Sequence, residues 1–439
     1  METFIKIVQF FLSLSFLVAI HEFGHFLVAR LFKIRVEKFY IFFDPWFSLF
    51  KFKRGDTEYG LGWVPFGGYV KIAGMIDESM DTEQMKQPAK PDEFRSKPAW
   101  QRFLVLIAGV VMNIILAFVI YCGISLAWGS SYLANDDVKW GYEFNEAAHA
   151  MGFEDGDKII AIDGQPIDNA NEILNALVIS DSEKRIDVER NGAVEEFTIP
   201  FEMLLDMRNN EQYADLYAPR MPMCVGEVVS DTAKEAGLLD GDVITAVNGE
   251  ESYSVQAIYE MIQQHKGENV ELRVERPDST FTLTAPVNDE GKVGFTVAPS
   301  LPLRVQKYGF FESIPAGARL TGKVVENYWQ QLKMIVKPKT EMYKNLGGFI
   351  AIGNIFPAEW DWRQFWYLTG FFSIILAIMN ILPIPGLDGG HALFTMWEMI
   401  TGRKPSDRFL EIAQYIGLAI ILFLLLYANG NDIYRFFLK

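Results

Sequence analysis

The sequence has few cysteines and no recognisable cleavage signal after its first apolar run. Two cysteines, Cys122 and Cys224, occur in 439 residues, so no disulfide framework is expected. The first apolar run lacks a basic start and a small-residue cleavage site, and it contains two histidines and a glutamate. These features argue against a secretory signal peptide and favour a retained helix.

Charged residues are absent or sparse in four long stretches. Half of the residues are hydrophobic, and the four stretches approach the roughly 20 residues that a membrane-spanning helix needs. They cover residues 4–31, 103–128, 365–382 and 412–427. The expected fold class is therefore a polytopic α-helical membrane protein with four transmembrane helices.

Basic residues are scarce between the second and third apolar runs. Residues 131–300 hold 34 acidic and 12 basic residues, a net charge of −22, although the whole chain carries only −16. Basic residues flank the apolar runs instead, in three groups: Arg30, Lys33, Arg35 and Lys38; Arg95, Lys97 and Arg102; Arg403, Lys404 and Arg408. The positive-inside rule makes these loops cytoplasmic, so we expect both termini and the acidic segment outside. The lipid bilayer is an expected partner, and nucleic acid is not.

The acidic segment contains an internal repeat at an offset of 85 residues. Residues 152–164 match residues 237–249, and each copy has a turn, a short alternating strand and an Asp-Gly or Asn-Gly hairpin signal. A helix-like stretch and β-rich segments follow. The pattern resembles a tandem pair of α+β PDZ domains, which accept an extended peptide as an added strand. Peptide binding and a role as spacers are both compatible with it.

Two other segments have regular patterns. Residues 59–73 alternate apolar and polar residues around Pro65, Gly67 and Gly68, which predicts a membrane-associated β-hairpin. Its glycines would let another backbone approach, so we expect it to order a substrate strand, with a plain turn as the alternative. Residues 311–335 have apolar residues at helical spacing, typical of a helix at the membrane interface or packed on the PDZ units.

These patterns predict nine consecutive parts of the chain. They are the first span (1–35), a cytoplasmic-side loop with the hairpin (36–98), the second span (99–130), two PDZ domains (131–219 and 220–302), an amphipathic interfacial helix and loop (303–362), the third span (363–393), a cytoplasmic loop (394–409), and the fourth span with the tail (410–439).

The strongest motif is His21-Glu22-Phe23-Gly24-His25 in the first span. Residues i and i+4 share one face of a helix, so both imidazoles can bind one Zn²⁺ while Glu22 projects towards an attached water. Zinc acidifies that water, and a neighbouring carboxylate can accept its proton and pass it to a leaving amine. Such polar residues are costly inside a membrane unless they are functional, which disfavours a chance match.

Catalytic zinc usually has three protein ligands, so a third should come from another span. Asp388 is the only carboxylate in the segment of residues 380–391, which closes the third apolar run. A capping or turn role for Asp388 and a ligand role for His391 are the alternatives.

The same segment contains candidate substrate-binding residues. Pro383 and Pro385 withhold two amide donors and should interrupt the helix, which frees backbone groups for a substrate strand. Asn380 could bond the substrate backbone or stabilise an oxyanion, or it could make a polar contact between helices. Asn113 in the second span has the same two interpretations.

Three motifs together make the chain resemble the site-2 protease family of intramembrane zinc metalloproteases. They are HEFGH (21–25), GWVPFGGYVKIAGM (62–75) and NILPIPGLDGGH (380–391), and the PDZ-like repeat resembles that of its regulator of sigma-E protease branch. The resemblance implies zinc ligation by His21, His25 and Asp388, with Glu22 as general base. It also implies a bacterial inner-membrane enzyme with periplasmic PDZ domains, whose substrates are single-span proteins such as an anti-sigma factor, and signal-peptide remnants.

The chain departs from the family at two places. Val110 follows Gly109 where the family usually has proline, and Phe349 follows Gly348 where proline is common. Neither change touches the metal-binding motifs. A zinc-binding transporter or a noncatalytic PDZ scaffold would be alternative functions, but the first has no use for Glu22 and the second leaves the metal-binding motifs unexplained.

Overall fold

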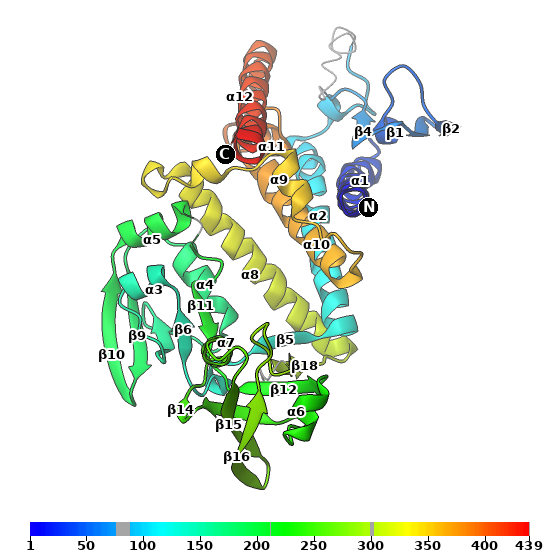
Figure 1. Ribbon diagram of the computed structural model, residues 1–439. Helices are drawn as coiled ribbons and strands as arrows, with labels where there is room; N and C mark the ends of the chain where they lie inside the picture. Colours follow the sequence, from blue (N-terminus) through cyan, green and yellow to red (C-terminus); the bar gives the residue numbers. More distant parts are fainter. Residues whose placement is uncertain (76–87, 211, 299–302, 439) are drawn as a thin grey trace. The chain divides into compact units, whose positions relative to one another are not determined.

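The computed structural model describes residues 1–75, 88–210, 212–298 and 303–438. The chain divides into two compact units. Met1–Gly129 and Lys307–Lys439 form one, here called the membrane unit, and Ser130–Gln306 form the other, here called the repeat unit. Figure 1 shows the membrane unit in blue, cyan and yellow to red, and the repeat unit mostly in green.

Four helices in the described part of the chain are long and apolar enough to cross a membrane, as the sequence predicts. They are α1 (Glu2–Leu31), α2 (Ala99–Trp128), α10 (Trp362–Ile381) and α12 (Asp407–Ile433). Helix α2 lies at the centre of the unit and packs against α1, α10 and two further helices, α8 (Phe310–Val336) and α11 (Asp388–Thr401). Helix α2 therefore connects the other four helices named here.

Helix α8 directs its apolar stripe at α2 and α10. Val324 and its neighbours pack with Ile120 and Tyr121 of α2 and with Ile374 of α10. The helices approach closely, because a Cβ on Gly317 would lie 2.5 Å from the sulfur of Cys122. The stripe thus packs on α2 and α10 of the membrane unit, a partner different from the predicted PDZ units, and the interfacial position stays a prediction.

A four-stranded sheet follows α1, with strand order β2-β3-β1-β4. Its strands are β1 (Val36–Phe43), β2 (Phe50–Arg54), β3 (Thr57–Leu61) and β4 (Val64–Ile72). Strand β1 pairs with β3 in parallel and with β4 in antiparallel orientation. Strand β4 is therefore an edge strand, and α1 packs against it.

The predicted hairpin around Pro65 is wrong in its position. Pro65, Gly67 and Gly68 lie within β4, and the hairpin of this segment is formed by β2 and β3. Proline is tolerated because β4 is an edge strand. A Cβ on Gly68 would lie 2.7 Å from the carbonyl oxygen of Tyr40. The backbone that comes close to this glycine is therefore that of β1 in the same sheet.

The repeat unit contains two modules, each with its own apolar core. The first module comprises β6 (Tyr142–Phe144), α3 (Glu146–Ala150), β7 (Lys158–Ile162), β8 (Gln165–Pro166), α4 (Asn171–Val178), β9 (Lys184–Arg190), β10 (Ala193–Ile199), α5 (Phe201–Asn209) and β11 (Tyr217–Pro219). The second comprises β12 (Met223–Val228), α6 (Asp231–Glu235), β13 (Val243–Val247), β14 (Glu250–Glu251), α7 (Val255–Gln263), β15 (Asn269–Arg276), β16 (Ser279–Pro286) and β17 (Phe295–Ala298). Strands β5 (Ser130–Leu133) and β18 (Leu303–Gln306) pair, so the two ends of the unit lie side by side.

The internal repeat extends to the ion pairs of two buried aspartates. In the first module the guanidinium of Arg190 donates to both carboxylate oxygens of Asp157, at 2.7 Å each, and to the carbonyl of Gly152. In the second module Arg276 donates in the same way to Asp242 and to the carbonyl of Gly237. The modules differ in α5, because residues 287–294 of the second module contain no corresponding helix.

Candidate metal centre

Helix α1 holds its two histidines against α2. His21 and His25 stand one turn apart and are 7% and 5% exposed. Between them, Gly24 allows α2 to come close, since a Cβ there would lie 2.5 Å from the carbonyl oxygen of Ala108. The i, i+4 spacing and the small residue between therefore place both imidazoles on the interior face of α1.

Three ligand-type atoms converge between α1 and α11. Oδ2 of Asp388 lies 3.0 Å from Nε2 of His21 and 3.3 Å from Nε2 of His25, and the two Nε2 atoms are 3.2 Å apart. Among the described residues, His21, His25 and Asp388 form a group able to hold a metal ion, with ligand atoms all within 4.8 Å of one another. Two imidazoles and one carboxylate fit catalytic zinc, which has three protein ligands and one open position.

Helix α2 forms the floor of this group at Gly109. A Cβ on Gly109 would lie 2.4 Å from Nε2 of His25 and 2.6 Å from Cε1 of His21. A side chain would therefore fill the space where the ligand atoms meet. In the sequence, Gly109 stands out only as part of the family motif, but its spacing of four residues from Asn113 on an apolar helix is a signal that the two share a face.

The outer nitrogen of each imidazole also contacts α2. Nδ1 of His25 lies 2.8 Å from the carbonyl oxygen of Val105, and Nδ1 of His21 lies 3.1 Å from Nδ2 of Asn113. Contacts of this kind orient a metal ligand and leave its Nε2 facing the ion. The role of the Val105 carbonyl had no signal in the sequence, because it belongs to the backbone.

Asp388 reaches the histidines through the break between α10 and α11. Helix α10 ends at Ile381 and α11 begins at Asp388, so the helix is interrupted around Pro383 and Pro385 as expected. Tight packing holds the break: a Cβ on Gly389 would lie 2.4 Å from the carbonyl carbon of Ile381. The carboxylate of Asp388 points at the imidazoles, and this contact favours the ligand interpretation over a turn or capping role.

His21, His25 and Asp388 line a cavity of about 660 Å³. Its lining brings together most of the residues singled out in the sequence: His21, Glu22, His25, Gly67, Gly68, Asn380, Asp388 and His391. Pro383 and Pro385 are not among the lining residues. The carbonyl of Pro385 instead faces α12, where a Cβ on Gly417 would lie 1.4 Å from it. The two prolines thus lie outside the cavity, and among the described residues only the half-buried Glu22 adds a second carboxylate to its lining.

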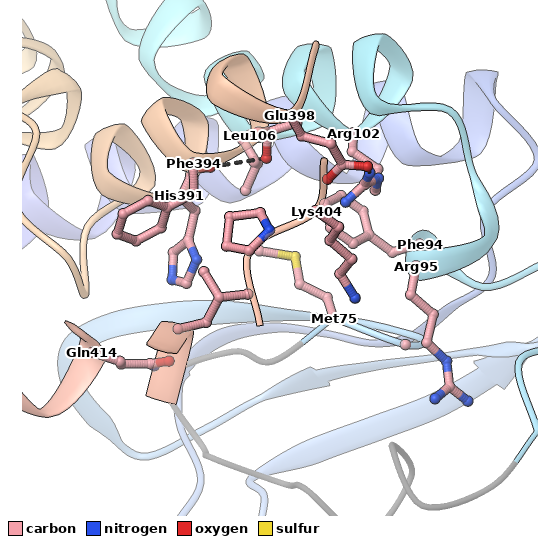
Figure 2. Close-up of a pocket in the computed structure, with 14 residues that line it drawn as sticks. Met75, Phe94, Arg95, Arg102, Leu106, His391, Phe394, Glu398, Lys404 and Gln414 are labelled. Atoms are coloured by element: carbon pink, nitrogen blue, oxygen red, sulfur yellow. Dashed lines mark hydrogen bonds and ion pairs between the residues drawn. The ribbon is translucent and has the colours of Figure 1, made fainter. Parts of the chain in front are cut away.

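A smaller cavity of about 90 Å³ adjoins the first and is shown in Figure 2. Both cavities have Met75, His391 and Gln414 in their walls. Arg102 of α2 and Glu398 of α11 form an ion pair at the smaller cavity. His391 lies outside the group of three ligand residues, in the wall between the two cavities.

Comparisons with known proteins match almost the entire chain. The family model described as Peptidase family M50 matches residues 9–424. The Regulator of sigma E protease of Haemophilus influenzae is 30% identical, over 97% of this chain and 98% of that protein. Protease RseP of Yersinia pestis is 27% identical, over 98% of both chains. The matched region includes all three residues of the metal-binding group and both modules.

Proposed function

Because this chain belongs to Peptidase family M50 and is a multi-pass membrane zinc metalloprotease of the site-2 type, we propose that it hydrolyses peptide bonds within transmembrane segments of single-span proteins. The observation that carries this proposal is the convergence of His21, His25 and Asp388 in one cavity with Glu22. The ligand atoms come from one apolar helix, α1, and from α11, which follows the apolar helix α10, and this supports a reaction inside the membrane unit.

The residues have separate roles in the proposed reaction. His21, His25 and Asp388 hold Zn²⁺, which when bound supplies a Lewis acid and an acidified water. The carboxylate of Glu22 lines the same cavity and accepts the proton of the attacking water. Glu22 then donates that proton to the leaving nitrogen. The nitrogen therefore leaves as a neutral amine and not as an amide anion.

Strand β4 supports binding of the substrate as an extended strand. One edge of β4 pairs with β1, and in the described part of the chain no other strand pairs with it. Residues 67–72 of β4 line the cavity. A substrate unwound next to the metal centre can add to this edge through main-chain hydrogen bonds. In this role the substrate bonds to the backbone edge of β4. Gly67 and Gly68 contribute by letting β4 lie close to β1.

Residues at the end of α10 complete the proposed substrate site. Asn380 lines the cavity and is placed to bond the substrate backbone or a developing oxyanion. Pro383 and Pro385 act indirectly. They lie between the end of α10, one residue after Asn380, and the start of α11 at Asp388. Their contribution is to the position of the other residues.

The cellular setting is proposed from the relatives and the charge pattern. We place the chain in a bacterial inner membrane with both termini and the repeat unit in the periplasm. The reason is that basic residues flank those ends of the apolar helices that point away from the termini and the repeat unit. Two relatives are a regulator of sigma E protease and an RseP protease. An anti-sigma factor is therefore the proposed substrate, with signal-peptide remnants as a second class. The two modules are proposed to be PDZ domains that select substrates through bound peptides.

The test compares the wild-type protein with Glu22→Gln in detergent, with a single-span protein as substrate. Cleavage by Glu22→Gln should be about 10²–10⁴-fold slower, because the general base is lost. Zinc content, measured on both proteins, should be equal because Glu22 is not a ligand. Equal cleavage by the two proteins would contradict the role of Glu22, and cleavage restricted to water-soluble peptides would contradict the proposed substrate class.

A further inference from the structure

We propose that Asn113 is a positioning residue that fixes the tautomer of His21 by offering its amide oxygen to Nδ1. The inference rests on the proposed function, since it concerns a zinc ligand. It assigns to a residue of α2, which does not line the main cavity, an effect on metal affinity that is exerted through His21. The assignment starts from the surroundings of the Asn113 side chain.

The side chain of Asn113 is fully enclosed, at 0% exposure. One end of its amide lies against His21, with 3.1 Å between Nδ2 and Nδ1. The oxygen at the other end, Oδ1, is buried and has no hydrogen-bond partner among the described residues. The contact with His21 is therefore the interaction that decides which end of the amide faces the imidazole.

The choice of end follows from the chemistry of imidazole. A neutral histidine carries one ring proton, and a nitrogen that binds a metal ion must be free of it. If Nε2 of His21 binds zinc, its Nδ1 carries the proton and must donate to an acceptor. The amide of Asn113 meets this need after a half-turn about its terminal bond, which places Oδ1 at the position of Nδ2.

His25 offers an internal comparison for this arrangement. Its Nδ1 lies 2.8 Å from the carbonyl oxygen of Val105, which can only accept a hydrogen bond. Nδ1 of His25 must therefore be the donor, so Nε2 is free for a metal ion. Helix α2 then provides one acceptor for each histidine, a backbone carbonyl for His25 and the side chain of Asn113 for His21.

The backbone of Asn113 is also held in place. The hydroxyl of Ser373 on α10 donates to the carbonyl oxygen of Asn113 at 2.8 Å. On the same face of α10, Thr369 donates to the hydroxyl of Ser13 on α1 at 3.0 Å. These bonds tie α10 to both helices of the His21 contact, so the amide has little freedom to move away from the imidazole.

The experiment measures zinc affinity of the full chain in detergent by competition with a chelator. Asn113→Leu keeps the size of the side chain but removes the acceptor, and it should raise the zinc Kd about 10–100-fold. Asn113→Asp retains an oxygen at the same place and should keep the Kd within about threefold of the wild type. A donor role for the amide predicts the opposite for Asn113→Asp, which would then lose affinity as Asn113→Leu does.

Gln9→Leu is the matched control. Gln9 of α1 is a second fully enclosed amide, it donates to the carbonyl of Pro357, and its Oε1 also lacks a partner among the described residues. Gln9→Leu should leave the zinc Kd unchanged. The absorption spectrum of the Co²⁺-substituted protein should change for Asn113→Leu and not for Gln9→Leu or Asn113→Asp.

Three outcomes would overturn the assignment. They are unchanged zinc affinity in a folded Asn113→Leu protein, equal weakening in Asn113→Leu and Asn113→Asp, and equal weakening in Gln9→Leu. If Asn113→Leu does not fold, Asn113→Asp alone decides between acceptor and donor. Failure of the wild type to bind zinc would instead contradict the proposed function, which separates the two hypotheses.

Discussion

Asp157 and Asp242 of the repeat unit and Asp388 of the membrane unit have different partners. In the repeat unit, Asp157 and Asp242 each face an arginine that neutralises the carboxylate and bonds both of its oxygens. In the membrane unit, Asp388 faces two histidines whose own outer nitrogens are occupied by α2. Removing one partner of such an ion pair destabilises a fold because it leaves a buried charge unpaired, whereas a carboxylate and two imidazoles around a small space are a suitable ligand set for a cation.

The sharpest test of this comparison makes the same change in both units. Asp388→Asn should lower zinc affinity and cleavage more than about 10²-fold and leave the fold intact, because a ligand is worth more than the outer contacts around it. Asp157→Asn should leave zinc content unchanged and destabilise the first module by about 2 kcal/mol, because it weakens a charged hydrogen-bond pair.

The measurements are zinc content, cleavage rate and hydrogen exchange of the full chain. Faster exchange in β7 and β9 is expected for Asp157→Asn and not for Asp388→Asn. The comparison would break down if Asp388→Asn unfolded the membrane unit while Asp157→Asn had no effect on exchange, since the two carboxylates would then have exchanged roles.

A second test concerns the space at the metal centre. Gly109→Ala should reduce bound zinc to less than about a tenth, because its Cβ would lie 2.4 Å from Nε2 of His25. Gly123→Ala, on the same helix, is the control, since a Cβ there has no neighbour within 4 Å among the described atoms. Equal zinc content in the two variants would show that the close approach of α2 does not shape the site.

The smallest expected effect is the response of the second module to acid. Burial raises the pKa of the Asp242 carboxyl, but the hydrogen bonds from Arg276 outweigh it, and the pKa lies below its usual range. The pair therefore stabilises the module at pH values above the unfolded pKa of about 3.9, and this contribution is lost as the pH falls towards the lowered pKa.

Hydrogen exchange in β13 and β15 between pH 5 and pH 3 checks this response. Protection in the wild type should fall over this range more than protection in Asp242→Asn, which lacks the titrating group. An identical loss of protection in both proteins would assign the acid sensitivity to other carboxylates.

Much of this protein could be predicted from local sequence patterns. The four apolar runs became four long helices because length and hydropathy suffice to define a membrane span. The spacing of His21 and His25 sufficed to put both on one helical face, and the repeat at residues 152–164 and 237–249 reappears in matching ion pairs. These features depend on neighbours within a few residues.

The position of the β-hairpin could not be predicted in this way. Residues 59–73 alternate as a hairpin should, yet β4 pairs with β1, whose residues lie more than 20 positions earlier. Strand pairing depends on which edges meet in three dimensions, and alternation alone does not distinguish a turn from a bulged edge strand.

By itself, the amino-acid sequence determined the helices, the repeat and the chemical types in the metal-binding motif. The tertiary structure alone decided that Gly109, Val105 and Asn113 of α2 surround the two histidines, and that Asp388 reaches them across 363 positions from His25. The physical reason is one of range. Helix formation and side-chain periodicity are local, whereas a metal site requires atoms from separate helices to converge within a few ångströms, and only packing of those helices achieves this.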